Sequence, residues 1–171
     1  LEISREIARR FCDVFGADIL LEPKPLLTEV PKVPGLDGRK MSKSYGNSIE
    51  LAEDLTSVEK KVMRMFTDPG KKRATDKGNP DGCVVFAFHK IYNPACKERE
   101  AECRAGSVGC VDCKKQLFAH MKNPMEEFRA ARQRVASDNA AVDAILEEGA
   151  KKARESARSV MEKVRKAMRL A

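Results

Sequence analysis

Apolar residues recur at intervals of three or four along most of this chain, a spacing that predicts amphipathic helices. The first helix is expected from about Glu2 to Phe15, with Gly16 placed to end it. Ser48 is placed to cap a short acidic helix, and a capping box at residues 56–59 predicts another helix. The apolar face of that second helix carries Val58, Val62, Met65 and Phe66.

The last third of the chain has the most regular pattern. From residue 111 it is helical almost to the end, with Pro124 as a start or kink and Asp138 as an expected N-cap. A stripe of apolar and small residues predicts that the final helix packs in a bundle. Its members are Ile145, Ala150, Ala153, Ala157, Val160, Val164 and Ala167.

Three stretches depart from the helical pattern. Residues 18–21 are apolar and predict a short buried strand, whereas residues 67–82 are polar, hold two prolines and three glycines, and predict an exposed loop. Residues 83–92 are apolar enough to be buried, but the spacing of their apolar residues does not distinguish a helix from a strand. We expect His89, within this stretch, to be a packed core residue.

Composition favours the same fold class. Hydrophobic residues make up 42% of the chain, charged residues 35% and aromatic residues only 5%, which is typical of surface-rich helices and predicts a mainly α protein. No apolar run is long enough to cross a bilayer, and no charged-then-apolar leader is present. We therefore expect a cytoplasmic protein with no membrane partner.

The net charge of +7 is concentrated near the carboxyl end. Residues 150–171 hold eight basic and two acidic side chains, and residues 71–73 form a second basic cluster. Such a surface supplies the salt-dependent part of affinity for an RNA backbone. The alternative is that the charged helix is only a solvated face.

A loop at residues 35–47 carries the sharpest chemical pattern. Its glycines let the backbone approach a ligand closely, Lys40 and Lys43 supply cationic heads, and Ser42 and Ser44 supply hydroxyl donors. These are the groups that hold polyphosphate. The loop is not a Walker loop, because that motif needs Gly-Lys-Ser/Thr directly before a helix.

The string Lys40-Met41-Ser42-Lys43-Ser44 is identical to the signature loop of class I aminoacyl-tRNA synthetases. Its flanks, residues 29–39 and 45–49, resemble the version in tryptophanyl-tRNA synthetases, with the tyrosyl enzymes as the nearest rival. Residues 63–69 and 147–168 also resemble the bacterial tryptophanyl family. The resemblance covers essentially the whole chain.

This resemblance implies a fold and a division into domains. Residues 1–48 would be the carboxy-terminal end of a Rossmann-like catalytic domain, and residues 49–171 an α-helical domain that binds the tRNA anticodon. The upstream His-Ile-Gly-His-type sequence of the family is missing, since the only histidines are His89 and His120. The chain is therefore expected to be a carboxy-terminal piece that is inactive alone.

The implied activity is ATP-dependent activation of tryptophan, followed by transfer to tRNA(Trp), in an enzyme that is a homodimer when complete. Lys40 and Lys43 would stabilise the charge that moves onto pyrophosphate, with Mg²⁺ sharing it. Met41, Ser42 and Ser44 would complete the nucleotide-binding loop.

Cysteines form the second pattern. Cys83, Cys96, Cys103, Cys110 and Cys113 fall within 31 residues, whereas Cys12 stands apart as an apolar core residue. A disulfide framework is not expected in a cytosolic enzyme, so a metal or a cluster is the better interpretation. Four thiolates suit either zinc or an iron-sulfur cluster.

Some bacterial tryptophanyl-tRNA synthetases carry a 4Fe-4S cluster on one distant cysteine followed by Cys-x6-Cys-x2-Cys, which Cys103, Cys110 and Cys113 match. The resemblance makes Cys83 the first ligand, although it lies nearer to Cys103 than in the family pattern and Cys96 competes for the role. Zn²⁺ is the alternative occupant. The cluster would act as a structural staple.

Two other readings of the chain use different function classes. In the first, the chain is a stand-alone helical RNA-binding module held together by a metal or cluster. In the second, the cysteines are unligated and the basic helix is only solvated surface. Tight tRNA binding by the isolated chain would favour the first, and metal-free folding with unchanged stability would favour the second.

Overall fold

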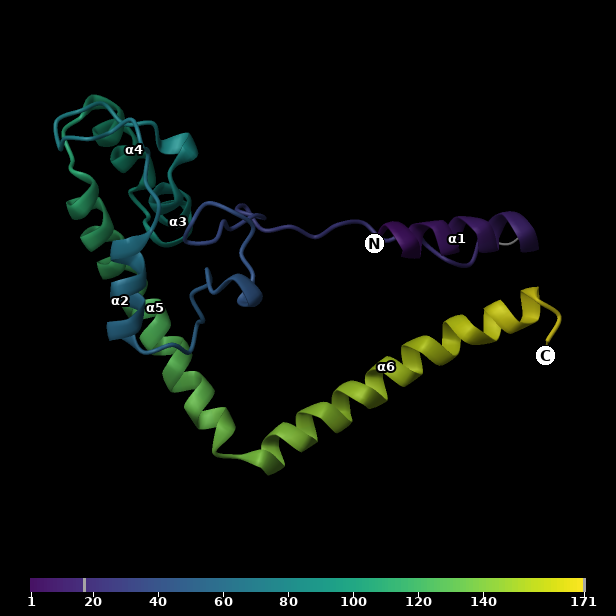
Figure 1. Ribbon diagram of the computed structural model, residues 1–171. Coiled ribbons are helices and arrows are strands. Elements are labelled where there is room, and N and C mark those ends of the chain that lie inside the picture. The colour runs from purple at the N-terminus through teal and green to yellow at the C-terminus, as the bar shows by residue number, and fades with distance from the viewer. Residues whose placement is uncertain (17, 171) are drawn as a thin grey trace. The chain divides into compact units, whose positions relative to one another are not determined.

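Helices dominate the computed structural model, which describes residues 1–16 and 18–170 (Figure 1). They are α1 (Glu2–Phe15), α2 (Leu55–Arg64), α3 (Val84–Tyr92), α4 (Cys96–Ala105), α5 (Cys110–Ala136) and α6 (Asn139–Ala167). Two short 3₁₀ turns, η1 (Lys43–Tyr45) and η2 (Pro80–Gly82), lie between them. The described residues form no strand, and the expected mainly α fold is confirmed. Among the same residues, no helix combines the length and apolar composition needed to cross a membrane.

The chain divides into two compact units. The first contains residues 1–27 and 135–171, which include α1 and α6. The second contains residues 28–134, with α2, α3, α4 and nearly all of α5. Both candidate sites lie in the second unit, so its core decides their geometry.

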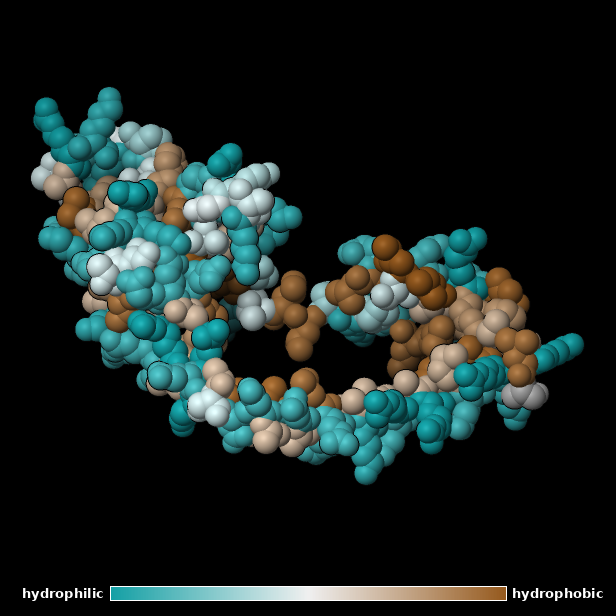
Figure 2. Space-filling model, turned by 60° about the horizontal axis from the view of Figure 1, so that its bottom comes forward, coloured by the Kyte–Doolittle hydropathy of each residue, from teal (hydrophilic) through white to brown (hydrophobic). Residues whose placement is uncertain are grey.

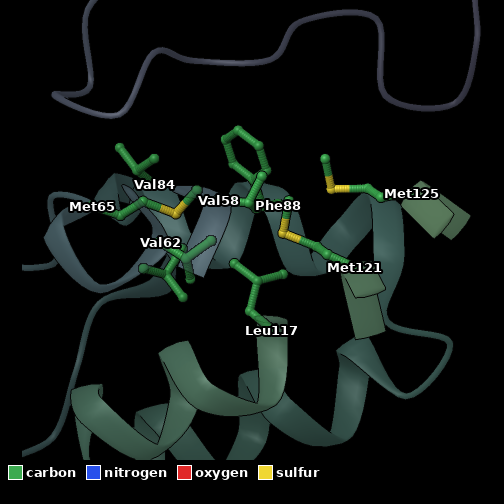
Figure 3. Close-up of a cluster of buried hydrophobic side chains, with 9 residues drawn as sticks. Val58, Val62, Met65, Val84, Phe88, Leu117, Met121 and Met125 are labelled. Atoms are coloured by element: carbon green, nitrogen blue, oxygen red, sulfur yellow. The ribbon is translucent and has the colours of Figure 1, made fainter. Parts of the chain in front are cut away.

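The core of the second unit is made by α2, α3 and α5. Val58 and Val62 of α2 and Leu117 of α5 are fully buried, because apolar residues three or four apart share one helix face. Phe88 of α3 and two methionines of α5 complete the cluster (Figure 3). Met65 is buried as predicted, whereas Phe66 is 44% exposed. The α2 core face is therefore confirmed except at its last position.

The start of α2 differs from the prediction. Asp54 caps the helix by accepting a hydrogen bond of 2.9 Å from the Ser57 backbone amide, so the helix begins before the predicted capping box. No acidic helix follows Ser48. The Lys61 ammonium explains this, because it donates to the Ser48 carbonyl and to the Glu53 carboxylate, and so draws both groups into a tertiary contact.

The apolar stretch at residues 83–92 forms α3, and His89 is completely buried in it. The His89 Nε2 lies 3.1 Å from the carbonyl oxygen of Cys113, and the Nδ1 lies 3.1 Å from the amide nitrogen of Asn93. Burial lowers the His89 pKa from 6.5 to about 4. His89 is therefore a neutral core residue, as predicted.

The polar stretch between α2 and α3 has no regular structure apart from η2, as predicted for a loop. Two of its residues are nevertheless buried, namely Lys71 and Pro80. Pro124 lies inside α5 without ending it. Asp138 caps α6 by accepting a hydrogen bond of 2.9 Å from the Ala141 amide, which confirms the predicted cap.

In the first unit, the predicted strand at residues 18–21 is not formed. The chain instead runs back along α1, whose side chains bind its backbone: the Arg5 Nε donates to the Pro23 carbonyl at 2.8 Å. A strand needs a neighbouring strand to satisfy its amides, and the described part of this unit supplies a helix instead.

The apolar stripe of α6 is mostly exposed. Only Val164 is buried, whereas Ile145 is 67% exposed. Figure 2 shows apolar surface along both helices of this unit. The predicted bundle packing is therefore limited to one position of the stripe.

We predict that Leu117→Ala lowers the free energy of unfolding by about 2–5 kcal/mol, because it leaves a cavity where the three helices meet. Leu51→Ala is the matched control, since Leu51 lies in the same unit and is 50% exposed. Urea unfolding followed by circular dichroism measures both. Equal losses for the two variants would contradict the proposed core.

We also predict a pH dependence caused by His89. The unfolded imidazole binds a proton below pH 6.5 and the folded one only below about 4, so stability is lost as the pH falls through this window. The slope is at most about 1.4 kcal/mol per pH unit. Urea unfolding of chelator-treated protein should show this slope in the wild type but not in His89→Gln. The same slope in both proteins would refute the role of His89.

Candidate active-site loop and cysteine cavity

Residues 35–47 form a tight loop on the surface of the second unit. Its arms are joined by an antiparallel bridge between Pro34 and Lys40, and the Gly35 amide donates to the Arg39 carbonyl at 2.7 Å. Gly38 turns the chain between them with a φ of 83°, in the left-handed region that favours glycine. The sequence folds here as a turn because its glycines permit it.

Asn47 lies at the centre of this loop and is 4% exposed. Its Oδ1 accepts from the Ser42 backbone amide at 2.8 Å. Its Nδ2 donates to Asp37 Oδ1 at 2.8 Å and to the Lys40 carbonyl at 3.2 Å. One amide side chain therefore joins three separate points of the loop.

Asp37 keeps its negative charge in this arrangement. The hydrogen bond from Asn47 is the largest cause that lowers the Asp37 pKa from 3.8 to about 2, and the adjacent Arg39 adds to it. The guanidinium of Arg39 lies 2.6 Å from the Asp37 carboxylate and also stacks over the Tyr45 ring, 5.1 Å from its centroid.

The predicted nucleotide-binding residues lie together on the outer side of the loop. Lys43 begins η1 and its side chain is 89% exposed, with the ammonium 4.0 Å from a carboxylate oxygen of Glu50. The hydroxyls of Ser42 and Ser44 lie 2.7 Å apart. Lys40 is exposed, whereas Met41 is half-buried and packs against the helical core. The loop is therefore anchored by Met41 and presents its lysines to solvent.

A groove of about 960 Å³ beside Lys43 contains two further cations, Lys61 of α2 and Arg132 of α5. Glu53 pairs with Lys61 at 2.8 Å. Sequence reasoning did not find Arg132, because it lies almost ninety residues after the loop and no local pattern links the two. The basic spacing along α5 was the only available signal.

Four cysteines line one small cavity in the second unit: Cys83, Cys103, Cys110 and Cys113. They come from the N-cap of α3, the end of α4 and the first turn of α5. Cys96, at the start of α4, does not line this cavity. The structure therefore brings together the four predicted ligands and leaves out their competitor.

The thiols affect one another electrostatically. Burial is the main cause that raises the Cys113 pKa to about 12, and the other three cavity thiols each raise it further. The Cys103 pKa is also raised, first by burial and then by Cys83. The raised pKa values keep the Cys103 and Cys113 thiols protonated at neutral pH.

Two buried cations counter this effect from the cavity wall. Lys71 is 9% exposed, and its ammonium donates to the carbonyls of Ala74 and Asp76. The Arg99 side chain is 13% exposed and pairs with Glu102 at 2.6 Å, yet its buried Nε has no hydrogen-bond partner. Sequence reasoning missed both cations, because only the fold brings them to the cysteines.

Gly78 packs closely against one of the cavity cysteines. A Cβ atom on Gly78 would lie 2.6 Å from the Cys103 sulfur, so any side chain at position 78 would clash with this thiol. Among the residues that the structure describes, no three His, Cys, Asp or Glu side chains lie close enough together to hold a single metal ion.

Comparison with known proteins identifies relatives of the whole chain. The family of class I tRNA synthetases (W and Y) matches residues 1–126. A tryptophan–tRNA ligase from Aquifex aeolicus is 49% identical over 99% of this chain and 44% of its own length. The ligase from Thermotoga maritima is 43% identical, over 99% of this chain and 52% of its own length.

A solved structure gives the same relationship. The tryptophanyl-tRNA synthetase from Campylobacter jejuni, complexed with ADP and tryptophan, superposes with a TM-score of 0.69 at 27% identity, over 98% of this chain and 52% of that chain. The present chain spans about half the length of the curated relatives it matches. With the family match over most of its length, the chain belongs to the class I tRNA synthetases of the tryptophan and tyrosine type.

Proposed function

We propose that this chain works as part of a longer tryptophan–tRNA ligase, which activates tryptophan with ATP and transfers it to tRNA(Trp). The observation that carries the proposal is the pair of exposed lysines on a loop anchored to a helical core, in a chain whose close relatives are tryptophan–tRNA ligases. The alternative of a tyrosyl-tRNA synthetase has less support, because these relatives are named tryptophan–tRNA ligases.

The proposed chemistry is electrostatic. When the tryptophan carboxylate attacks the α-phosphate of ATP, negative charge builds on the leaving pyrophosphate. Lys43 and Lys40 would bind that charge, and their exposed ammonium groups are free to reach a polyphosphate. Mg²⁺ bound with ATP would neutralise part of the same charge. The Ser42 and Ser44 hydroxyls would donate to phosphate oxygens.

Residues 1–48 are proposed to belong to the catalytic domain and residues 49–171 to the helical domain that binds the anticodon. Contacts within the chain group residues 28–48 with α2 to α5, so the lysine loop touches the helical part directly.

The basic residues of α6 would supply salt-dependent affinity for the tRNA backbone. All six cysteines are free thiols, which suits a reducing cytoplasm.

A 4Fe-4S cluster is the proposed occupant of the cysteine cavity. Four thiols line it, and Lys71 and Arg99 beside them would offset part of the negative charge that four thiolates bring to a cluster, with Arg99 also paired to Glu102. The unpartnered Arg99 Nε fits a sulfur acceptor. The residues that line the cavity are therefore suited to hold a 4Fe-4S cluster.

Zinc is the weaker candidate. A single Zn²⁺ draws four thiolates to about 2.3 Å from one point, and no such close group exists among the described residues. A cluster carries its iron atoms at separate corners and accepts ligands that lie further apart. Bound there, it would join α3, α4 and the first turn of α5 as a structural staple.

We predict that Lys43→Ala in the complete ligase lowers kcat for tryptophan-dependent ATP–pyrophosphate exchange about 100- to 1,000-fold. The KM for ATP should change far less, because the lost interaction acts in the transition state. Lys60→Ala, at an exposed position of α2, is the control and should leave both values unchanged. Equal losses in kcat and ATP affinity would contradict the role given to Lys43.

We predict four irons and four sulfides per chain in protein purified without oxygen, with Cys83→Ser and Cys103→Ser losing them. Cys96→Ser is the matched control and should keep both, because Cys96 lies outside the cavity. Iron, acid-labile sulfide and zinc analysis with a visible spectrum measures this. One zinc per chain would replace the cluster with the alternative cofactor, and loss of iron in Cys96→Ser would contradict the ligand set.

A further inference from the structure

We propose that Asn47 is a positioning residue for catalysis: its buried amide holds the lysine loop in the conformation that delivers Lys40 and Lys43 to pyrophosphate. The inference rests on the proposed function and deepens it. It assigns a role to a residue that follows the Lys-Met-Ser-Lys-Ser string and touches no ligand itself.

The geometry is specific to an asparagine. The site needs an acceptor for the Ser42 amide and two donors, one for the Asp37 carboxylate and one for the Lys40 carbonyl. An amide group supplies these, whereas an aspartate at neutral pH has no donor. Asn47 itself is 4% exposed, so its side chain makes these three bonds with little competition from water.

The two backbone groups that Asn47 binds flank Met41. The Lys40 carbonyl lies on one side and the Ser42 amide on the other, so the Asn47 amide fixes the two peptide planes around Met41. The first of these planes adjoins the Cα of Lys40, and Lys43 follows one residue after the second. An exposed loop fixed in this way needs less ordering when the transition state forms, and its cations act without reorganisation.

Asn47 also ties the loop to the protein core. Its backbone carbonyl accepts from the Leu36 amide at 2.8 Å, and the Leu36 carbonyl accepts from the Phe66 amide at 2.8 Å. Leu36 itself packs against the core cluster. A Cβ atom at Gly35 would overlap the Asn47 amide, so glycine there keeps the space for it. These bonds connect Asn47 to Phe66, just after the end of α2.

The test uses Asn47→Asp in the complete ligase. This change keeps the shape and the acceptor for Ser42, removes both donors and sets a second carboxylate against Asp37. We expect kcat for pyrophosphate exchange, per active site measured by adenylate burst, to fall 10- to 100-fold. The KM for tryptophan should not change. Asn123→Asp, at an exposed position of α5, is the matched control.

Two further variants separate positioning from general stability. Adding Asp37→Asn to Asn47→Asp restores an amide–carboxylate hydrogen bond with reversed direction and should recover kcat at least threefold. In a background that carries both Lys40→Ala and Lys43→Ala, Asn47→Asp should cost less than threefold, because its effect passes through the two lysines.

Three outcomes overturn the inference: an unchanged kcat per active site in Asn47→Asp, a loss confined to the fraction of folded enzyme, or a full additional loss in the background that lacks both lysines. A wild-type ligase without tryptophan-dependent exchange would refute the proposed function, and the inference with it. An active wild type with an unaffected Asn47→Asp refutes the inference alone.

Discussion

The packing of α2, α3 and α5 on one another is the constraint on which both candidate sites depend. Val58, Val62 and Leu117 are completely buried at this contact. Met41 of the lysine loop packs against the same cluster, and so do Cys83 and Cys113 of the cavity. A single small core therefore supports both the lysine loop and the cysteine cavity.

Local patterns in the sequence were enough for much of this. Helix spacing predicted α1 and the buried face of α2, Asp138 was recognisable as a cap, and the Lys-Met-Ser-Lys-Ser string marked the loop. Cysteine spacing also selected Cys103, Cys110 and Cys113, and the family resemblance added Cys83; all four line one cavity. In each case the deciding information lies within about thirty residues of sequence.

The failures come from contacts between distant segments. The helix expected after Ser48 is absent because Lys61, thirteen residues away, binds the Ser48 carbonyl. The strand expected at residues 18–21 is replaced by a segment bound to α1 side chains. Arg99 and Lys71 reach the cysteine cavity only through folding. Neither the hydrophobic periodicity nor the helix and strand propensities of the sequence indicate such contacts between distant segments.

The fit between Gly35 and Asn47 couples the sizes of the two side chains. The asparagine amide occupies the volume that any side chain at position 35 would need, so neither position is free to drift without the other. A larger residue at 35 is tolerated only together with a smaller one at 47, and that smaller residue would give up the three hydrogen bonds of the amide. Positions 35 and 47, twelve residues apart, therefore limit the size of each other's side chain.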